Sequence, residues 1–248
     1  MREPINVSGM VLSVSPVGEY DKRVVILTRE LGKITAFARG ARRMKSPLMA
    51  VSNPFVFGEF QVYEGRDSYT LSGANIKEYF LDLAQMQPGV YYGFYFLELA
   101  EYFGQEGNDE TRMLSLLYVT MNAIRRGKQD LRLVRCIFEL RTITISGEAP
   151  QMFSCMECST KENLTVFSLR DSAIYCPNCG KTIRDPWPLQ PGTVLACRYI
   201  IAAPLAKLYG FTVNEEILDE LERLLRAYLH RYVCLLYTSP SPRDSTSS

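Results

Sequence analysis

The first eighty residues alternate between apolar and polar positions with the period of two that is typical of β-strands. Short runs rich in Val, Ile, Tyr and Phe are separated by turn residues. Five strands are predicted, at residues 11–17, 23–28, 33–38, 55–63 and 69–76. Leu31-Gly32 predicts a tight hairpin turn between the second and third strands. This pattern predicts a small closed barrel, although an SH3-like barrel or a small sandwich would give a similar strand count.

Beyond residue 80 the apolar positions recur at helical spacing. Helices are predicted over residues 90–103, 111–126, 130–145 and 215–232. The last is the clearest, because one apolar stripe runs along it and Asn214 or Thr212 stands where a helix N-cap is expected. A cysteine-bearing loop at residues 147–187 interrupts the helices. The chain is therefore predicted to be an α+β multidomain protein, with a β-domain over residues 1–80 and a helical domain over residues 81–233.

The C-terminal segment fits neither pattern. Nine of the eleven residues 238–248 are Ser, Thr or Pro, a composition that cannot build an apolar core. Residues 234–248 are expected to be either a disordered C-terminus or sequence that is not native to the protein. The second interpretation arises because Cys234 to Asp244 looks like the adapter-derived ends of unrelated environmental reading frames.

The overall composition restricts the class of protein without identifying it. Hydrophobic residues at 47% and charged residues at 22% are ordinary for a globular protein. The net charge of +1 gives no global attraction to nucleic acid or membrane, so any such surface has to be local. Met1 to Gly9 contains no apolar run typical of a secretory signal, and no apolar stretch approaches the roughly 18 residues of a membrane span. A cytoplasmic protein is expected, in which cysteines stay reduced and available to metals.

Four cysteines form two C-x2-C pairs, and they are the strongest chemical signal in the chain. Cys155 and Cys158 are followed, after 17 intervening residues, by Cys176 and Cys179. Each pair places two thiolates on one tight turn, and two such turns complete a tetrahedron around zinc. The spacing predicts one structural Zn²⁺, because four thiolates leave no position for an activated water. Four unrelated buried cysteines or a redox-active C-x-x-C pair are the alternatives.

The remaining cysteines and the charges near the zinc-binding pattern have ordinary interpretations. Cys136 and Cys197 lie among apolar residues and are expected to be buried fillers, while Cys234 falls in the C-terminal segment. Four basic residues near the predicted zinc site are either solvated charges or a contact surface for nucleic acid. These are Lys161, Arg170, Lys181 and Arg184.

A second signal is the sequence Arg-Gly-Ala-Arg-Arg-Met-Lys from Arg39 to Lys45, which holds four positive charges and no acid. It follows the third predicted strand. A basic loop at the rim of a barrel can neutralise phosphates, and Gly40 allows close backbone approach. An ordinary solvated turn is the alternative. The predicted DNA-binding residues are Arg39, Arg42, Arg43 and Lys45, together with Arg23 and Lys33 on the preceding strands.

Catalytic signals are weak. The chain contains a single histidine, His230, and no P-loop, paired metal-binding carboxylate motif or histidine cluster. The acids Asp21, Asp67, Asp82 and Asp171 are scattered singly. The protein is therefore not expected to be an enzyme.

Several short motifs give the chain a resemblance to a known family. Together they resemble the N-terminal domain of the RecO family of bacterial recombination mediators. They are Gly9-Met10-Val11-Leu12, Gly18-Glu19-Tyr20-Asp21, Leu27-Thr28, Gly32-Lys33 and Ala38-Arg39-Gly40-Ala41-Arg42-Arg43. A helical domain that carries a repeated C-x2-C pair and ends in an amphipathic helix fits the same family. The resemblance covers roughly residues 1 to 233.

The resemblance implies an N-terminal OB-fold of five strands, followed by an α-helical domain with an inserted four-cysteine zinc ribbon. RecO-like proteins bind single- and double-stranded DNA and anneal complementary strands. They act with RecR and remodel single-strand-binding protein so that RecA can load, and they are not enzymes. By this resemblance the basic loop contacts phosphates and the protein acts on the nucleoid in the cytoplasm.

The chain departs from the family in two places. Met44 stands where the family often has proline, and the Ser/Pro-rich end replaces a basic C-terminal segment. A second hypothesis is that the protein is a zinc-containing adapter whose barrel mainly binds partner proteins, which the near-neutral net charge favours.

Overall fold

The structure of the protein is a computed structural model that describes residues 3–232. Its most compact division is into two units, one up to Arg125 and one from Arg126 onward. The segment expected to be disordered or non-native at residues 234–248, which includes Cys234, lies outside the described residues.

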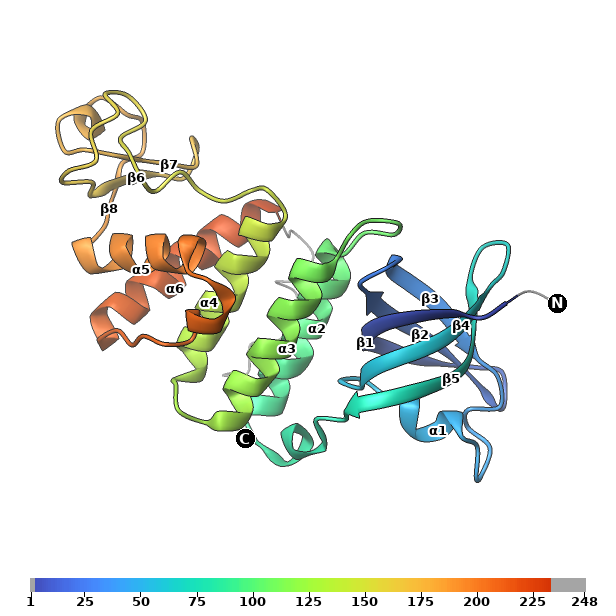
Figure 1. The fold of residues 1–248 in the computed structure, drawn as a ribbon. Coiled ribbons are helices and arrows are strands. Elements are labelled where there is room, and N and C mark those ends of the chain that lie inside the picture. Colours follow the sequence, from blue (N-terminus) through green and yellow to red (C-terminus); the bar gives the residue numbers. More distant parts are fainter. Residues whose placement is uncertain (1–2, 233–248) are drawn as a thin grey trace. The chain divides into compact units, whose positions relative to one another are not determined.

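Five strands close into a barrel in the first unit, where Figure 1 shows them in blue to cyan. They are β1 (Ile5–Val17), β2 (Asp21–Thr28), β3 (Gly32–Ala38), β4 (Phe57–Glu64) and β5 (Tyr69–Glu78). Around the barrel the order is β1-β2-β3-β5-β4, and β4 pairs again with β1. All pairs are antiparallel except β3 with β5. This OB-like barrel confirms the expected fold class.

The alternation of β3 shows why the sequence folds in this way. Ile34, Ala36 and Ala38 are buried in the barrel, whereas Thr35 and Phe37 between them are half-buried on the outer side. The interior is filled by branched and aromatic side chains from every strand, as the period-two pattern requires. Strand β1 begins earlier than predicted because it pairs with β4 over its first half and with β2 over its second, around a bulge between Val11 and Ser13.

Helical segments complete the first unit. They are α1 (Leu48–Val51), the 3-10 helix η1 (Leu81–Gln85), α2 (Gly89–Phe103) and α3 (Thr111–Arg126). Helix α2 packs on the barrel, since the Phe94 ring lies edge-on to that of Phe55 at 4.8 Å between centroids. Lys33 of β3 also donates a hydrogen bond to the backbone carbonyl of Glu101 at 2.7 Å. These contacts explain why α2 belongs to the same compact unit as the barrel.

The second unit contains three longer helices and a small ribbon. The helices are α4 (Leu131–Ile145), α5 (Pro191–Ala202) and α6 (Glu215–Tyr232), with the 3-10 helix η3 (Leu205–Lys207) before α6. Asn214 accepts a hydrogen bond from the Ile217 backbone N–H at 2.9 Å, so it is the N-cap residue of α6. The sequence pattern missed α5 because its apolar residues do not form one narrow stripe.

The ribbon lies within the loop predicted at residues 147–187. It consists of β6 (Val166–Ser168), β7 (Ala173–Tyr175) and β8 (Trp187–Pro188), in the order β7-β6-β8, with the 3-10 helix η2 (Cys179–Lys181) between β7 and β8. Such short strands provide little pairing energy, so this segment depends on another source of stability.

Candidate nucleic-acid interface and metal centre

The basic loop begins where β3 ends at Ala38, and it is held in a defined conformation. Ala41 is fully buried in the barrel core and anchors the middle of the loop. The backbone N–H of Arg43 donates to the carbonyl of Gly40 at 3.0 Å, which makes a tight turn. Gly40 has a φ of +67°, a left-handed conformation that glycine adopts without steric cost. Its N–H donates to the Asp21 carboxylate at 2.7 Å, tying the loop to β2.

The loop is also bound to the turn between β1 and β2. The Arg42 backbone N–H donates to the carbonyl of Tyr20 at 2.8 Å, and its guanidinium reaches the carbonyl of Gly18 at 3.3 Å. The guanidinium of Arg43 lies over the Tyr20 ring, 4.9 Å from its centroid. The β1–β2 turn and the loop after β3 therefore form one surface. We name it the loop platform and define it as residues 18–20 and 39–45.

The predicted loop cations are available to an anion. Arg39, Arg42, Arg43 and Lys45 are all exposed. Within residues 3–232, none of these four side chains forms an ion pair with a carboxylate. Unneutralised cations that lie close together repel one another, and phosphates relieve that repulsion.

The two strand residues predicted to extend the patch differ in position. Arg23 is exposed on β2, lies directly opposite Phe37 and reaches the Thr35 hydroxyl at 3.5 Å, so it lies on the outer surface that leads to the loop. Lys33 lies six positions before Arg39 along the chain, and its ammonium is bound to the Glu101 carbonyl. The structure brings Arg23 toward the loop cations but does not bring Lys33 to them.

Two residues of this region were not among the predicted site residues. Lys22 is half-buried and donates to the Ser52 carbonyl at 3.0 Å and to the Asn53 side chain at 2.9 Å. Burial lowers the pKa of Lys22, and the nearby positive charge of Arg42 lowers it further. Tyr20 is the last residue of the β1–β2 turn and is 41% exposed. One sequence signal could have identified Tyr20 as a site residue. It is an aromatic residue in a tight turn, where the side chain has no core to fill.

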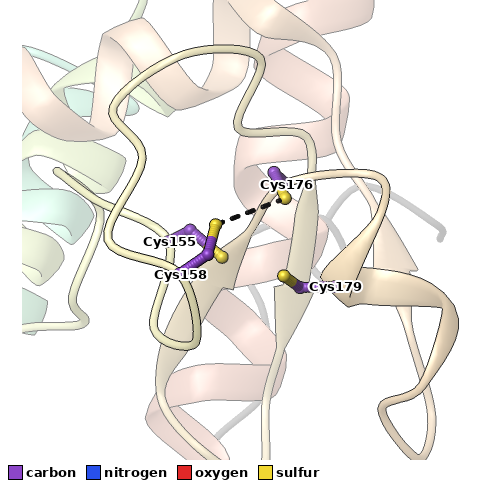
Figure 2. Close-up of side chains that lie close together, drawn as sticks. All are labelled: Cys155, Cys158, Cys176 and Cys179. Atoms are coloured by element: carbon purple, nitrogen blue, oxygen red, sulfur yellow. Dashed lines mark hydrogen bonds between the residues drawn. The ribbon is translucent and has the colours of Figure 1, made fainter.

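The four cysteines of the second unit converge on one point, as Figure 2 shows. All four sulfur atoms lie within 4.8 Å of one another, and the sulfurs of Cys158 and Cys176 are 3.8 Å apart. A tetrahedral metal with bonds of about 2.3 Å separates its sulfur ligands by about 3.8 Å. The four thiols therefore fit a tetrahedral metal ion. The structure confirms the convergence that the C-x2-C spacing predicted.

Local backbone geometry holds the two cysteine turns. In the first, the Ser159 N–H donates to the Cys155 carbonyl at 2.9 Å, and in the second the Gly180 N–H donates to the Cys176 carbonyl at 2.8 Å. Only glycine fits at position 180, because a Cβ there would lie 2.8 Å from the side chain of Val166 in β6. The second turn is thus packed directly on the ribbon.

The acidities of the thiols favour a bound cation. Burial raises the pKa of Cys155, but hydrogen bonds from backbone N–H groups outweigh it and lower the pKa to about 6. The hydrogen bond between the side chains of Cys179 and Cys176 raises the pKa of Cys179 to about 12. One thiol of the cluster is thus more acidic than a free cysteine, while Cys179 keeps its proton through the hydrogen bond with Cys176. A divalent cation bound by all four sulfurs would replace that proton.

The other two described cysteines behave as apolar residues. Cys136 on α4 and Cys197 on α5 are buried, as the sequence predicted. Burial raises the pKa of Cys136 well above its usual value and that of Cys197 to about 12. Both thiols stay protonated and unreactive.

No helix among the described residues is both long enough and apolar enough to cross a membrane.

The four basic residues predicted near the cysteines are all exposed, and Arg170 lies 3.8 Å from the Asp171 carboxylate. They surround the ribbon without forming a turn-bound cluster like that of the loop platform.

Comparison with known proteins defines the class. Two family models match the chain, "Recombination protein O N terminal" over residues 1–80 and "Recombination protein O C terminal" over residues 89–237. The first model covers the barrel, and the second begins at α2 and includes the four-cysteine centre. The chain belongs to the RecO family of DNA repair proteins.

Three relatives illustrate the similarity, and each carries the name "DNA repair protein RecO". The protein of Alkaliphilus metalliredigens is 31% identical over 91% of this chain and 92% of its own length. That of Acetivibrio thermocellus is 28% identical over 94% of both chains. The Bacillus subtilis protein is 27% identical over 97% of this chain and 94% of its own.

Proposed function

We propose that the protein is a non-catalytic, DNA-binding recombination mediator. The observation that carries this proposal is the loop platform, in which Arg39, Arg42, Arg43 and Lys45 are exposed, free of ion pairs with described carboxylates and fixed by turns on a rigid barrel. Arg23 extends the surface along β2. Lys33 has no part in it, because α2 holds its ammonium.

The mechanism follows from the character of these contacts. Arginine and lysine contacts to phosphates carry no sequence information, so the surface binds single- and double-stranded DNA of any sequence. Neutralising phosphates lowers the repulsion between two complementary strands and lets them anneal. With RecR, the protein is expected to remodel single-strand-binding protein on DNA so that RecA loads. The site of this activity is the nucleoid in the cytoplasm.

The cysteine centre has a structural part in this proposal. Zinc is the ion that suits four thiolates in a tetrahedron, and Cys155, Cys158, Cys176 and Cys179 would hold it. Four protein ligands leave no position for water or substrate, so the ion supports no hydrolysis. Its contribution is to stabilise a ribbon whose strands have only two or three residues each.

The proposal is tested by DNA binding and strand annealing with the triple variant Arg39→Gln, Arg42→Gln, Arg43→Gln. We expect weaker binding to a fluorescent single strand and slower annealing of complementary oligonucleotides, with the fold unchanged by circular dichroism. A matched control replaces Arg170, Lys181 and Arg184 with Gln, which removes the same charge from the ribbon. Equal loss in both variants would show that total charge, rather than the loop platform, governs binding.

The second candidate function is a protein-interaction adapter whose barrel mainly binds partner proteins. The net charge of +1 favours it, since a dedicated DNA-binding protein is usually more basic. This hypothesis predicts little affinity for DNA at physiological salt unless a partner is present. Binding by the isolated chain that is lost in the triple variant would exclude it as the main function of the barrel.

A further inference from the structure

The exposed ring of Tyr20 is fixed inside the cationic surface, and the proposed phosphate contacts do not use it. Val17 ends β1 and Asp21 begins β2, so Tyr20 is the last residue of a three-residue turn, directly before β2. Gly18 adopts a φ of +55° there and makes the turn tight. With 41% of its surface exposed, Tyr20 is not a core residue. A solvated turn has no need of an aromatic side chain.

The ring has a fixed position relative to the loop cations. The Arg42 N–H holds the Tyr20 carbonyl at 2.8 Å, and the Arg42 side chain holds the Gly18 carbonyl. Asp21, the next residue, accepts the hydrogen bond of Gly40. Hydrogen bonds on both sides of Tyr20 thus connect its turn to the loop, so the ring and the cations are preorganised as one surface.

The charges around the ring separate the positions of phosphates and bases. Glu19 is exposed beside Tyr20, and a carboxylate repels phosphate. The loop side of the platform carries Arg39, Arg42 and Arg43 and attracts it. A strand that lays its phosphates on the loop would thus present its bases toward the turn. There Tyr20 offers an aromatic face for stacking, and Arg43 lies over the ring as a cation.

We infer that Tyr20 stacks against an unpaired nucleobase and gives the loop platform a preference for single-stranded over double-stranded DNA. The bases of a duplex are paired and stacked on one another, so they cannot reach the ring, while their phosphates still reach the arginines. This inference rests on the proposed function, because it requires that DNA bind at the loop. It assigns discrimination between strands to Tyr20 and general affinity to the arginines.

Exposure of an aromatic ring is not by itself sufficient to assign base stacking to it. Tyr91, Phe94 and Tyr102 are also exposed, on α2. That helix contains no Lys or Arg between Gly89 and Phe103 but does contain Glu98 and Glu101. The helix itself therefore offers a phosphate backbone no basic side chain. Tyr91 therefore provides a matched control for the loss of an exposed tyrosine ring.

The experiment compares Tyr20→Leu, Tyr20→Phe and the control Tyr91→Leu by fluorescence anisotropy at one salt concentration. Three probes of equal length are used: oligo-dT, the same backbone with stable abasic tetrahydrofuran units, and a duplex. We expect Tyr20→Leu to bind oligo-dT roughly 5- to 150-fold more weakly, the range measured for loss of one base–aromatic stack. Binding to the abasic strand and to the duplex stays unchanged, and Tyr20→Phe retains the wild-type affinity for oligo-dT.

Two results would overturn the inference. Wild-type affinity of Tyr20→Leu for oligo-dT would show that no base stacks there. An equal loss on the abasic strand would show that Tyr20 acts only by positioning Arg43. Neither result touches the proposed function, whose failure appears separately as unchanged binding of all three probes by the triple arginine variant.

Discussion

At the scale of single residues, the loop platform depends on backbone conformation as well as on charge. Gly40 has a left-handed φ of +67°, and a Cβ there would meet only the Arg43 side chain, at an ordinary 3.6 Å. Replacement by alanine therefore adds backbone strain of about 1 kcal/mol without a clash or a change of charge. The turn that presents the arginines is weakened as a result.

We expect Gly40→Ala to reduce single-strand affinity several-fold while the overall fold is retained, as measured by anisotropy and circular dichroism. Gly127→Ala is the control, because Gly127 has a φ of +60° and open space around it but lies outside the loop platform. An unchanged affinity in Gly40→Ala would mean that the arginines bind DNA from many loop conformations.

Single-residue chemistry was predictable from sequence only where spacing alone decides it. The C-x2-C spacing predicted that the thiols lie together. A run of basic residues without acidic ones favours exposure to solvent. The place of Lys33 could not be predicted, because its hydrogen-bond partner Glu101 lies on a helix 68 residues further along the chain. Tyr20 was missed because its position beside Arg43 depends on how two turns meet.

At the scale of elements, α4 and α6 are joined by a partly buried ionic network. Arg132 on α4 is hydrogen-bonded to Glu222 on α6, with the Arg132 Nε and a Glu222 carboxylate oxygen 2.9 Å apart, and also pairs with Glu215 and Asp219. The side chains of Arg132 and Glu222 are only 17% and 10% exposed. The bond with Glu222, together with those to the other two acids, raises the pKa of Arg132, so the pair stays charged.

We predict that Arg132→Met lowers the free energy of unfolding of the second unit by about 2–4 kcal/mol in urea, because the Glu222 carboxylate loses its main partner inside the fold. The exposed pair between Lys77 and Glu59 is the comparison, and Lys77→Met should cost less than about 1 kcal/mol. Similar small effects of both variants would mean that Arg135, which also pairs with Glu222, is sufficient.

The ribbon is the element expected to depend on the proposed metal ion. Removal of the ion by a chelator should speed amide hydrogen exchange in β6, β7 and the two cysteine turns and leave the exchange of barrel strands unchanged. Mass spectrometry of the exchanged protein measures both regions in one sample. If chelation instead abolished DNA binding while both units stayed folded, the ribbon would be a contact surface and its role would not be structural.

The elements themselves were largely predictable, since strong periodicity gave all five strands and four of the longer helices. Helix α5 was missed because a short helix with apolar residues on several sides lacks a clear period. The grouping of α2 with the barrel in one compact unit is a further feature of the structure. It arises because α2 packs on β1 and β2, a tertiary contact that local sequence does not record.

At the scale of the whole molecule, we propose that the barrel and the second unit have separate tasks. In this proposal the barrel presents arginines to DNA phosphates, while the second unit contains an ionic helix pair and a ribbon with a four-cysteine site for a metal ion. Both family models of the RecO family match the chain, one over the barrel and one from α2 onward. The central claim is that DNA binding is electrostatic and located at the loop platform.

The salt dependence of single-strand binding tests that claim most directly. Each neutralised phosphate of a single strand contributes about −0.7 to the slope of log affinity against log salt. Replacing Arg39, Arg42 and Arg43 with Gln should therefore lower the affinity and flatten the slope by about 2, while the ribbon variant at Arg170, Lys181 and Arg184 keeps the wild-type slope. A triple loop variant with the affinity and slope of the wild type would contradict the account.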